Sequence, residues 1–250
     1  MFLPLILLAL CFAALCWFLR NDLTEYAAFK KLTDTRDRQR RIRVWILRSF
    51  LLFFAGTAVC LAVLRRLKAP FVFPSEFLPL AARFHAAIPG NHAHASQVLL
   101  PFMIGAGGGV LIGILLALLF ARRFRPARLG DIDALMPRNR AETLWMALIS
   151  VNAGVSEELF FRLLLPLLLT LATRSALTSF LIAAVIFGLV HLYQRLPGIL
   201  ATTLIGLALS AVYLITGNLW IAVLLHIVLD LIGVVVRPSL ERWLRPAARR

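Results

Sequence analysis

Charge is scarce in this sequence, and long stretches of it have none. Asp, Glu, Lys and Arg make up 16% of its 250 residues, whereas about 25% of the residues in a soluble domain are charged. Residues 98–121 and 176–194 contain no charged residue, and residues 197–230 contain only the acid at their end, Asp230. Apolar runs of about 18 or more residues are typical of membrane-spanning helices. The composition therefore excludes a soluble globular domain and predicts an all-α, polytopic transmembrane helix bundle.

Cysteine is also rare and shows no spacing typical of a metal site. The three cysteines, Cys11, Cys16 and Cys60, lie in apolar stretches and form no CxxC pair. This excludes a zinc ribbon, and we interpret the three as packing residues. The glycine-rich run at 105–109 is not followed by the Lys-Ser/Thr pair of a phosphate-binding loop, which excludes a nucleotide site of that kind.

The apolar stretches predict about seven membrane spans. We expect them near residues 2–19, 44–64, 98–121, 142–172, 176–194, 198–216 and 218–236. The fourth is longer than one straight span requires. We therefore expect it to break near Val151–Gly154, which reads VNAG, with part of it lying at the membrane interface.

Acidic residues are few, with 12 against 27 lysines and arginines and a net charge of +15. Such an excess can indicate nucleic-acid binding, but here the cations flank the apolar runs, as in Arg36–Arg43 and Ala121–Arg128. We therefore expect anionic lipid headgroups, and no nucleic acid, as partners. With seven spans, 20 cations fall on the side of the C-terminus and five on the other. This predicts a multi-pass cell-membrane protein with its N-terminus outside and its C-terminus in the cytoplasm.

Away from their ends, the predicted spans contain few residues that could carry chemistry. The acids are Glu157, Glu158 and Asp230, the histidines are His191 and His226, and all five fall in the last four spans. A charge at the bilayer centre costs about 2.5–3.5 kcal/mol, so such residues need partners inside the bundle. Three acids and two histidines on three helices are typical of a metal site or a water-activating site. Both histidines lie near predicted cytoplasmic ends, so we expect the site to open near that leaflet.

Helical spacing predicts which of these residues can pair. Glu158 and Arg162 are four residues apart and lie on one helix face, and His226 and Asp230 share that spacing. Glu157 is about 100° around the helix from Glu158, which leaves it without a local partner. A purely structural ion pair is the alternative interpretation of Glu158 and Arg162. A histidine and a free glutamate can together deprotonate a water molecule.

Three short motifs occur in order along the last spans. Glu157–Arg162 reads EELFFR and matches EExxxR, Phe187–His191 reads FGLVH and matches FxxxH, and His226–Asp230 reads HIVLD and matches HxxxN/D. This ordered set resembles the CPBP family of intramembrane proteases, which is Abi-related and includes the type II CAAX prenyl endopeptidases and bacteriocin-processing enzymes. The resemblance covers roughly residues 142–236. It implies an intramembrane (metallo)endopeptidase that cleaves a membrane-associated protein or peptide with an activated water.

The resemblance also implies roles for the matching residues. Glu157 matches the general base, and His191 matches the histidine that positions or activates the water. His226 and Asp230 match a pair that binds metal or stabilises the oxyanion. A divalent metal such as zinc could thus be held by Glu157, His191, His226 and Asp230.

The remaining motif residues, Glu158 and Arg162, match positions that support the site or contact substrate. Many members of the family have Asn where this sequence has Asp230. An Asn side chain can donate to an oxyanion, whereas an Asp can donate only when protonated but is the better metal ligand. The sequence has no HExxH, GxSG-like or GxGD motif, which argues against other types of intramembrane protease.

These expectations divide the chain into three regions. Residues 1–141 are expected to form N-terminal spans with a basic cytoplasmic loop, residues 142–236 a catalytic helical core, and residues 237–250 a basic cytoplasmic tail. Two alternatives are a proton-coupled transporter, whose buried acids and histidines would relay protons, and a non-proteolytic immunity or scaffold protein. The absence of an inverted repeat argues against the first, and the complete motif set argues against the second.

Overall fold

The computed structural model describes residues 2–87 and 131–239. The described residues form helices and no strand, which confirms the predicted all-α bundle. The α-helices are α1 (Phe2–Lys30), α2 (Thr35–Ser49), α3 (Gly56–Val63), α4 (Leu78–Ala87), α6 (Arg140–Glu158), α7 (Leu165–Thr173), α8 (Ala176–Leu189), α9 (Arg195–Thr216) and α10 (Leu219–Leu231). The π-helical segments are η1 (Phe50–Ala55), η4 (Leu159–Leu164) and η6 (Ile232–Val236), and the 3-10 segments are η2 (Ser75–Phe77), η3 (Asp133–Leu135) and η5 (Leu192–Gln194). The predicted span at 98–121, residues 122–130 of the basic loop that follows it and residues 240–250 of the basic tail lie outside the described residues.

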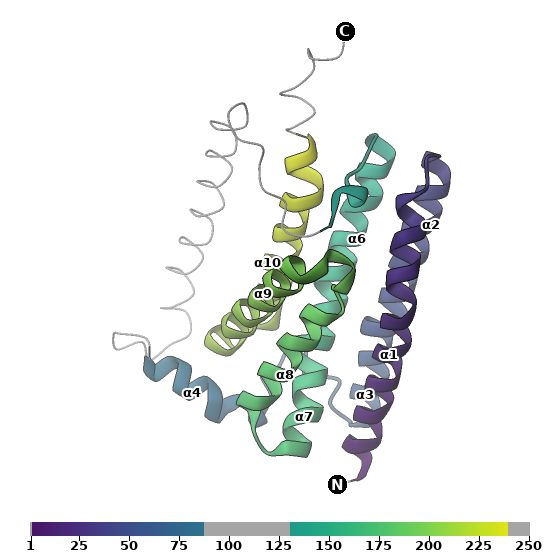
Figure 1. Cartoon of the computed structure of the whole chain (residues 1–250). Helices are drawn as coiled ribbons and strands as arrows, with labels where there is room; N and C mark the ends of the chain where they lie inside the picture. The colour runs from purple at the N-terminus through teal and green to yellow at the C-terminus, as the bar shows by residue number, and fades with distance from the viewer. Residues whose placement is uncertain (1, 88–130, 240–250) are drawn as a thin grey trace.

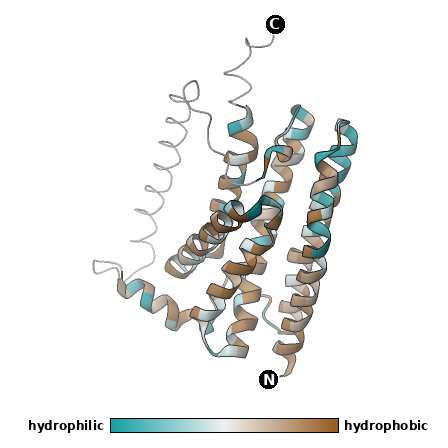
Figure 2. Ribbon diagram, in the orientation of Figure 1, coloured by the Kyte–Doolittle hydropathy of each residue, from teal (hydrophilic) through white to brown (hydrophobic). Residues whose placement is uncertain are grey.

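Four of the described helical segments are long and apolar enough to cross a membrane. They are Phe2–Lys30, Thr35–Val63, Leu192–Thr216 and Leu219–Ser239, and Ala176–Leu189 is a shorter apolar helix. The chain is therefore a membrane protein. Figure 1 shows α1 lying antiparallel to the continuous rod of α2, η1 and α3, with α6 and α7 beside this pair and α9 crossing the bundle obliquely. Hydrophobic residues cover most of the helices, and hydrophilic ones gather at the end of the α1–α2 pair (Figure 2).

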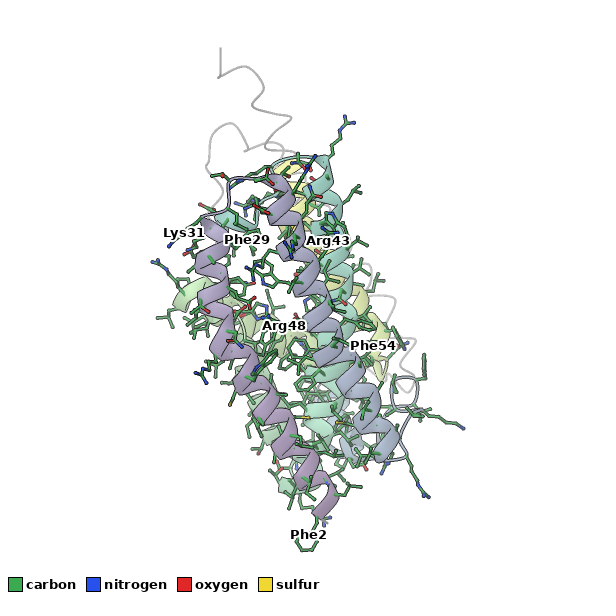
Figure 3. All side chains as sticks on the ribbon, turned by 90° about the vertical axis from the view of Figure 1, so that its right-hand side faces the viewer. Phe2, Phe29, Lys31, Arg43, Arg48 and Phe54 are labelled. Atoms are coloured by element: carbon green, nitrogen blue, oxygen red, sulfur yellow. The ribbon has the colours of Figure 1, made fainter. Side chains whose placement is uncertain are left out.

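The first two helices extend well beyond the predicted spans, because their charges are paired with each other. Sequence analysis ended the first span at residue 19, yet α1 continues to Lys30. Glu25 of α1 accepts hydrogen bonds from Arg48 at 2.6 Å and from the Trp45 indole at 3.0 Å, both on α2. Figure 3 shows Arg48 between the two helices. This contact pairs opposite charges of the two helices, which lowers the cost of placing them near lipid.

A second buried ion pair joins the α1–α2 hairpin to the start of α6. Arg38 of α2 and Glu142 of α6 are 1% and 0% exposed, with Nε of Arg38 3.2 Å from Oε1 of Glu142. Thr35 donates to the same oxygen at 2.9 Å, and the backbone N–H of Arg138 donates to Oε2 at 2.9 Å. Asn139 caps α6 by accepting from the Glu142 N–H. Breaking such a pair by removing one partner costs about 3–5 kcal/mol, so the hairpin is firmly attached to the rest of the bundle.

The helix predicted to break at VNAG does not break there. Residues 140–158 form one α-helix, and the regular pattern changes only at η4, where all six residues are buried. Gly154 serves close packing instead: a Cβ at this position would lie 2.4 Å from Cγ1 and 3.0 Å from the backbone nitrogen of Ile227 on α10. The expected break was wrong because a glycine inside a helix can mark either a bend or a close approach of two helices.

Replacing Gly154 with Ala should therefore destabilise the protein. The added methyl group pushes α10 away at Ile227, and overpacking of this kind typically costs about 1–3 kcal/mol. Thermal unfolding in detergent would show a lowered Tm. Gly233→Ala is the matched control, since no described residue outside its own stretch of helix lies within 4 Å of a Cβ placed there. Equal Tm values for the two variants would contradict the assigned role of Gly154.

Candidate active site

Glu158 joins two of the three sequence motifs. It is fully buried, and its Oε1 accepts a hydrogen bond from Nδ1 of His226 on α10 at 2.7 Å. The same oxygen lies 3.0 Å from Nη1 of Arg162, so the predicted i, i+4 pair is confirmed. The guanidinium is also buried and faces the Phe187 ring at 4.1 Å, which stabilises its charge further. Glu158 thus holds both a cation and a histidine in place.

The contact with Glu158 fixes the orientation of the His226 ring. Because Nδ1 donates to a carboxylate, Nε2 is the nitrogen that points toward the other acids. It lies 4.0 Å from Oε2 of Glu157 and 3.8 Å from Oδ2 of Asp230. The side chain of Asp230 is 39% exposed, whereas those of His226 and Glu157 are 6% and 13% exposed. The group of residues is therefore accessible from the side of Asp230.

Glu157 differs from its neighbour because neither of its carboxylate oxygens accepts a hydrogen bond from a described residue, whereas Oε1 of Glu158 is bonded to His226 and paired with Arg162. Oε2 is buried and without a hydrogen-bond partner among the described residues in both glutamates. The 4.0 Å separation from His226 is too long for a direct hydrogen bond. It suits a bridging water molecule about 2.8 Å from each atom. Glu157 is therefore the carboxylate in this cluster that is placed to accept a proton, as its helical position predicts.

His191 lies just beyond the end of α8, at the beginning of a tight turn. Its Nδ1 donates to the backbone carbonyl of Phe187 at 2.8 Å, which leaves Nε2 as the free ring nitrogen. The Phe187 ring lies between the two histidines, with its centroid 4.9 Å from that of His191 and 5.9 Å from that of His226. The three motifs, carried by α6–η4, α8 and α10, therefore meet around one aromatic ring.

A comparison with protein families matches the same part of the chain. Residues 139–232 match the family described as Rce1-like, type II CAAX prenyl endopeptidase. We refer to residues 139–232 as the Rce1-like domain after this match. The similarity agrees with the resemblance inferred from the motifs. No curated protein and no solved structure matches the chain.

Two features of the Rce1-like domain were missed by sequence reasoning. The first is Phe187, which was quoted as part of FGLVH without a role, although its ring contacts Arg162 and both histidines. Its position four residues before His191, on the same helix face, is the signal that could have identified it. The second is the π-helical segment η4, directly after Glu158. Such segments occur frequently at functional sites, but no residue pattern here predicts one.

The donor types in the Rce1-like domain fit a divalent metal, but their spacing does not. Imidazole nitrogens and carboxylate oxygens are ligands that zinc accepts. The described residues contain no group of three His, Cys, Asp or Glu side chains gathered as metal ligands. Nε2 of His226 is 4.0 Å and 3.8 Å from the nearby carboxylate oxygens, whereas donors around a tetrahedral zinc lie about 3.3 Å apart. We therefore assign no step of the reaction to a metal.

Proposed function

We propose that the Rce1-like domain hydrolyses a peptide bond of a membrane-associated protein or peptide, using a water molecule activated by Glu157. The observation that carries this proposal is the unequal surroundings of two adjacent glutamates. Glu158 is committed to His226 and Arg162. Glu157 has an unpartnered oxygen 4.0 Å from Nε2 of His226. A general base needs such a free oxygen within reach of a water molecule.

In the proposed reaction, a water molecule lies between Glu157 and His226. Glu157 takes a proton from the water molecule as the water oxygen attacks the scissile carbonyl carbon. Glu157 then passes this proton to the amide nitrogen, and the carbon–nitrogen bond breaks to release the amine. The carbonyl oxygen becomes an oxyanion. His226 can stabilise it by donating from Nε2 when both ring nitrogens are protonated, and Asp230 can donate when its carboxyl group is protonated. His191, with its Nδ1 bound to the Phe187 carbonyl, offers Nε2 to orient the water.

Glu158 and Arg162 hold the other residues of this arrangement in place. Glu158 keeps the His226 ring in one orientation, and its own charge is balanced by Arg162. Nη1 of Arg162 is engaged in the ion pair with Glu158, whereas Nε and Nη2 have no hydrogen-bond partner among the described residues. The guanidinium therefore also keeps donors that suit a polar group of the substrate, in line with the implied support or substrate-contact role.

A non-proteolytic scaffold and a proton-coupled transporter are the competing functions. The transporter is less well supported, because its acids and histidines would form a relay across the membrane. Here both histidines are instead close to one phenylalanine ring. A scaffold would not need a largely buried acid that forms no hydrogen bond with any described residue, as Glu157 does, since an unpaired buried polar group destabilises the folded state.

The direct test is cleavage of a peptide by the purified protein. An internally quenched, farnesylated peptide ending in a CAAX sequence is the probe that the family suggests. The same peptide without the lipid shows whether the prenyl group is required. Membrane-associated peptides from cells carrying the native protein, compared with those from Glu157→Ala cells, would identify other substrates. If the purified protein cleaves neither quenched peptide, and the peptides from native and Glu157→Ala cells are the same, the proposed protease function is refuted.

Asp230→Asn separates two roles of Asp230. If Asp230 donates to the oxyanion in its protonated form, the Asn variant should keep its activity and extend it to higher pH, because an amide does not titrate. If Asp230 binds a metal, the variant should lose metal affinity and cleavage together. We expect the first result. A native enzyme that is inhibited by a chelator, together with an inactive Asn variant, would show that the metal role is correct.

We also propose that the active site opens near the cytoplasmic leaflet, with the N-terminus outside. The end of α1 at Lys30 and the start of α2 are basic, whereas Phe2 marks the opposite end of the same hairpin (Figure 3). Cations of this kind favour the cytoplasmic side and anionic headgroups. The turn after His191 packs against Tyr26, one helical turn from Lys30. Labelling of single cysteines placed at residues 3 and 33 from either side of the membrane would test the orientation.

A further inference from the structure

The N-terminal helix α1 lies outside the Rce1-like domain but contacts the turn that carries His191. Tyr26 of α1 is buried, and its ring centroid is 4.9 Å from that of Tyr193 in η5. The hydroxyl of Tyr26 donates to the backbone carbonyl of Asp131 at 2.5 Å. The ring and the hydroxyl thus hold two different segments, and α1 is attached to η5 through an aromatic contact.

Asp131 strengthens the attachment from the other side of the turn. Its backbone N–H donates to the carbonyl of Gln194 at 3.1 Å, and its Oδ2 lies 3.5 Å from Nε of Arg195. The same carboxylate pairs with Lys30 at the end of α1. Arg195 has a φ of 63° and a ψ of −177°, a backbone conformation that is almost confined to glycine and costs another residue about 1–3 kcal/mol. The turn after His191 is therefore held by its surroundings and not by its own backbone preference.

Tyr193 connects this attachment to the histidine. It follows His191 by two residues, and the two ring centroids are 6.0 Å apart. Its hydroxyl accepts a hydrogen bond from the Gln194 side chain at 3.0 Å, which fixes the ring. His191 thus lies against the Phe187 ring, at 4.9 Å, and also has the Tyr193 ring as a neighbour. The Phe187 ring belongs to α8, while the position of Tyr193 depends on α1.

We propose that Tyr193, supported by Tyr26, is a positioning residue for His191, so that α1 forms part of the working active site. This inference rests on the proposed protease function. His191 lies beyond the last turn of α8, and its contacts with that helix are the bonds to the carbonyls of Phe187 and Gly188 and the packing on the Phe187 ring. A reacting group that moves by about 1 Å can lose about 10²-fold in rate, so a restraint on the ring at this position has a kinetic effect.

The kinetic experiment compares four variants on the quenched farnesylated peptide. Tyr193→Leu and Tyr26→Leu should each lower kcat by about 10- to 100-fold with little change in KM. Tyr193→Phe keeps the ring and should retain most of the rate. Phe29→Leu is the matched control: Phe29 is a buried aromatic of α1 whose ring packs on Trp45 of α2 at 4.7 Å and under the guanidinium of Arg38 at 4.4 Å, and not on Tyr193. Its loss should lower Tm and leave kcat unchanged.

Coupling between the two tyrosines gives a sharper criterion. If Tyr26 acts through Tyr193, the double variant should be little worse than either single Leu variant. Independent, multiplying losses would overturn the proposed linkage. A native kcat in Tyr193→Leu, or a loss in Phe29→Leu as large as that in Tyr26→Leu, would overturn the positioning role itself.

A measurement that needs no substrate keeps this inference separate from the protease function. In protein labelled with ¹⁵N and ¹³C at histidine, the ring resonances of His191 can be assigned by their absence in His191→Gln. Both Tyr→Leu variants should shift them, and Phe29→Leu should not. Shifts in a protein that cleaves nothing would refute the protease function and retain the contact. Cleavage abolished by Glu157→Gln, with unshifted His191 resonances in the tyrosine variants, would refute the positioning role alone.

Discussion

Glu157→Gln should lower the rate of peptide cleavage by about 10²–10⁴, while the protein still folds and enters the membrane. Gln has the size of Glu but cannot take a proton from water. The lost group is an oxygen that has no hydrogen-bond partner among the described residues, so its replacement removes no observed contact. The rate should be measured with purified protein at saturating peptide, so that the effect on kcat is separated from the effect on binding.

Glu76→Gln provides the control for this variant. The side chain of Glu76 is 17% exposed, close to the 13% of Glu157, and from η2, a segment that carries none of the three motifs, it pairs with Arg66. Cleavage by this variant should match that of the native enzyme. Near-native turnover by a purified Glu157→Gln protein would show that another group is the base.

Glu158→Ala should destabilise the protein by about 3–5 kcal/mol, because it leaves the buried guanidinium of Arg162 without its counter-charge. Adding Arg162→Leu should restore most of the lost stability, since replacing both members of a buried pair is often nearly neutral. Melting temperatures in detergent would measure both effects. The double variant should nevertheless stay inactive, because His226 still lacks the carboxylate that orients its ring.

The opposite order of stability would contradict this account of the pair. If the double variant melts clearly below Glu158→Ala, Glu158 and Arg162 do not compensate each other. Arg162 alone can be tested with Arg162→Lys, which keeps the charge but loses the planar face packed on the Phe187 ring. Its Tm should lie between those of the native protein and Glu158→Ala.

Local spacing predicted the contacts that one helix makes with itself. The pairing of Glu158 with Arg162 follows from helix geometry alone. The proximity of His226 to Asp230, at 3.8 Å, follows in the same way. The freedom of Glu157 followed because a neighbour 100° away on the helix cannot share the same partner. The apolar runs likewise predicted the helices, because the bilayer demands long segments that satisfy their own backbone.

Residue spacing along the sequence could not predict contacts between different helices. Nothing in the spacing indicates that Glu158 bonds to His226, 68 residues later, or that Tyr26 packs on Tyr193. The reading of VNAG as a break failed for the same reason, because the partner that explains Gly154, Ile227, lies on a distant part of the chain. The end of α1 was misplaced because Glu25 and Arg48 neutralise each other across the hairpin.

The buried pair of Arg38 and Glu142 links assembly of the protein to the order in which it is made. The two residues are 104 positions apart. At about 5–20 residues per second, the ribosome completes Glu142 roughly 5–20 s after Arg38. Throughout that interval Arg38 must stay hydrated or pair temporarily with another group, because burying an unpaired charge is costly. The α1–α2 hairpin can therefore settle into its final position only after α6 has emerged, so the N-terminal helices are synthesised first and fixed in place later.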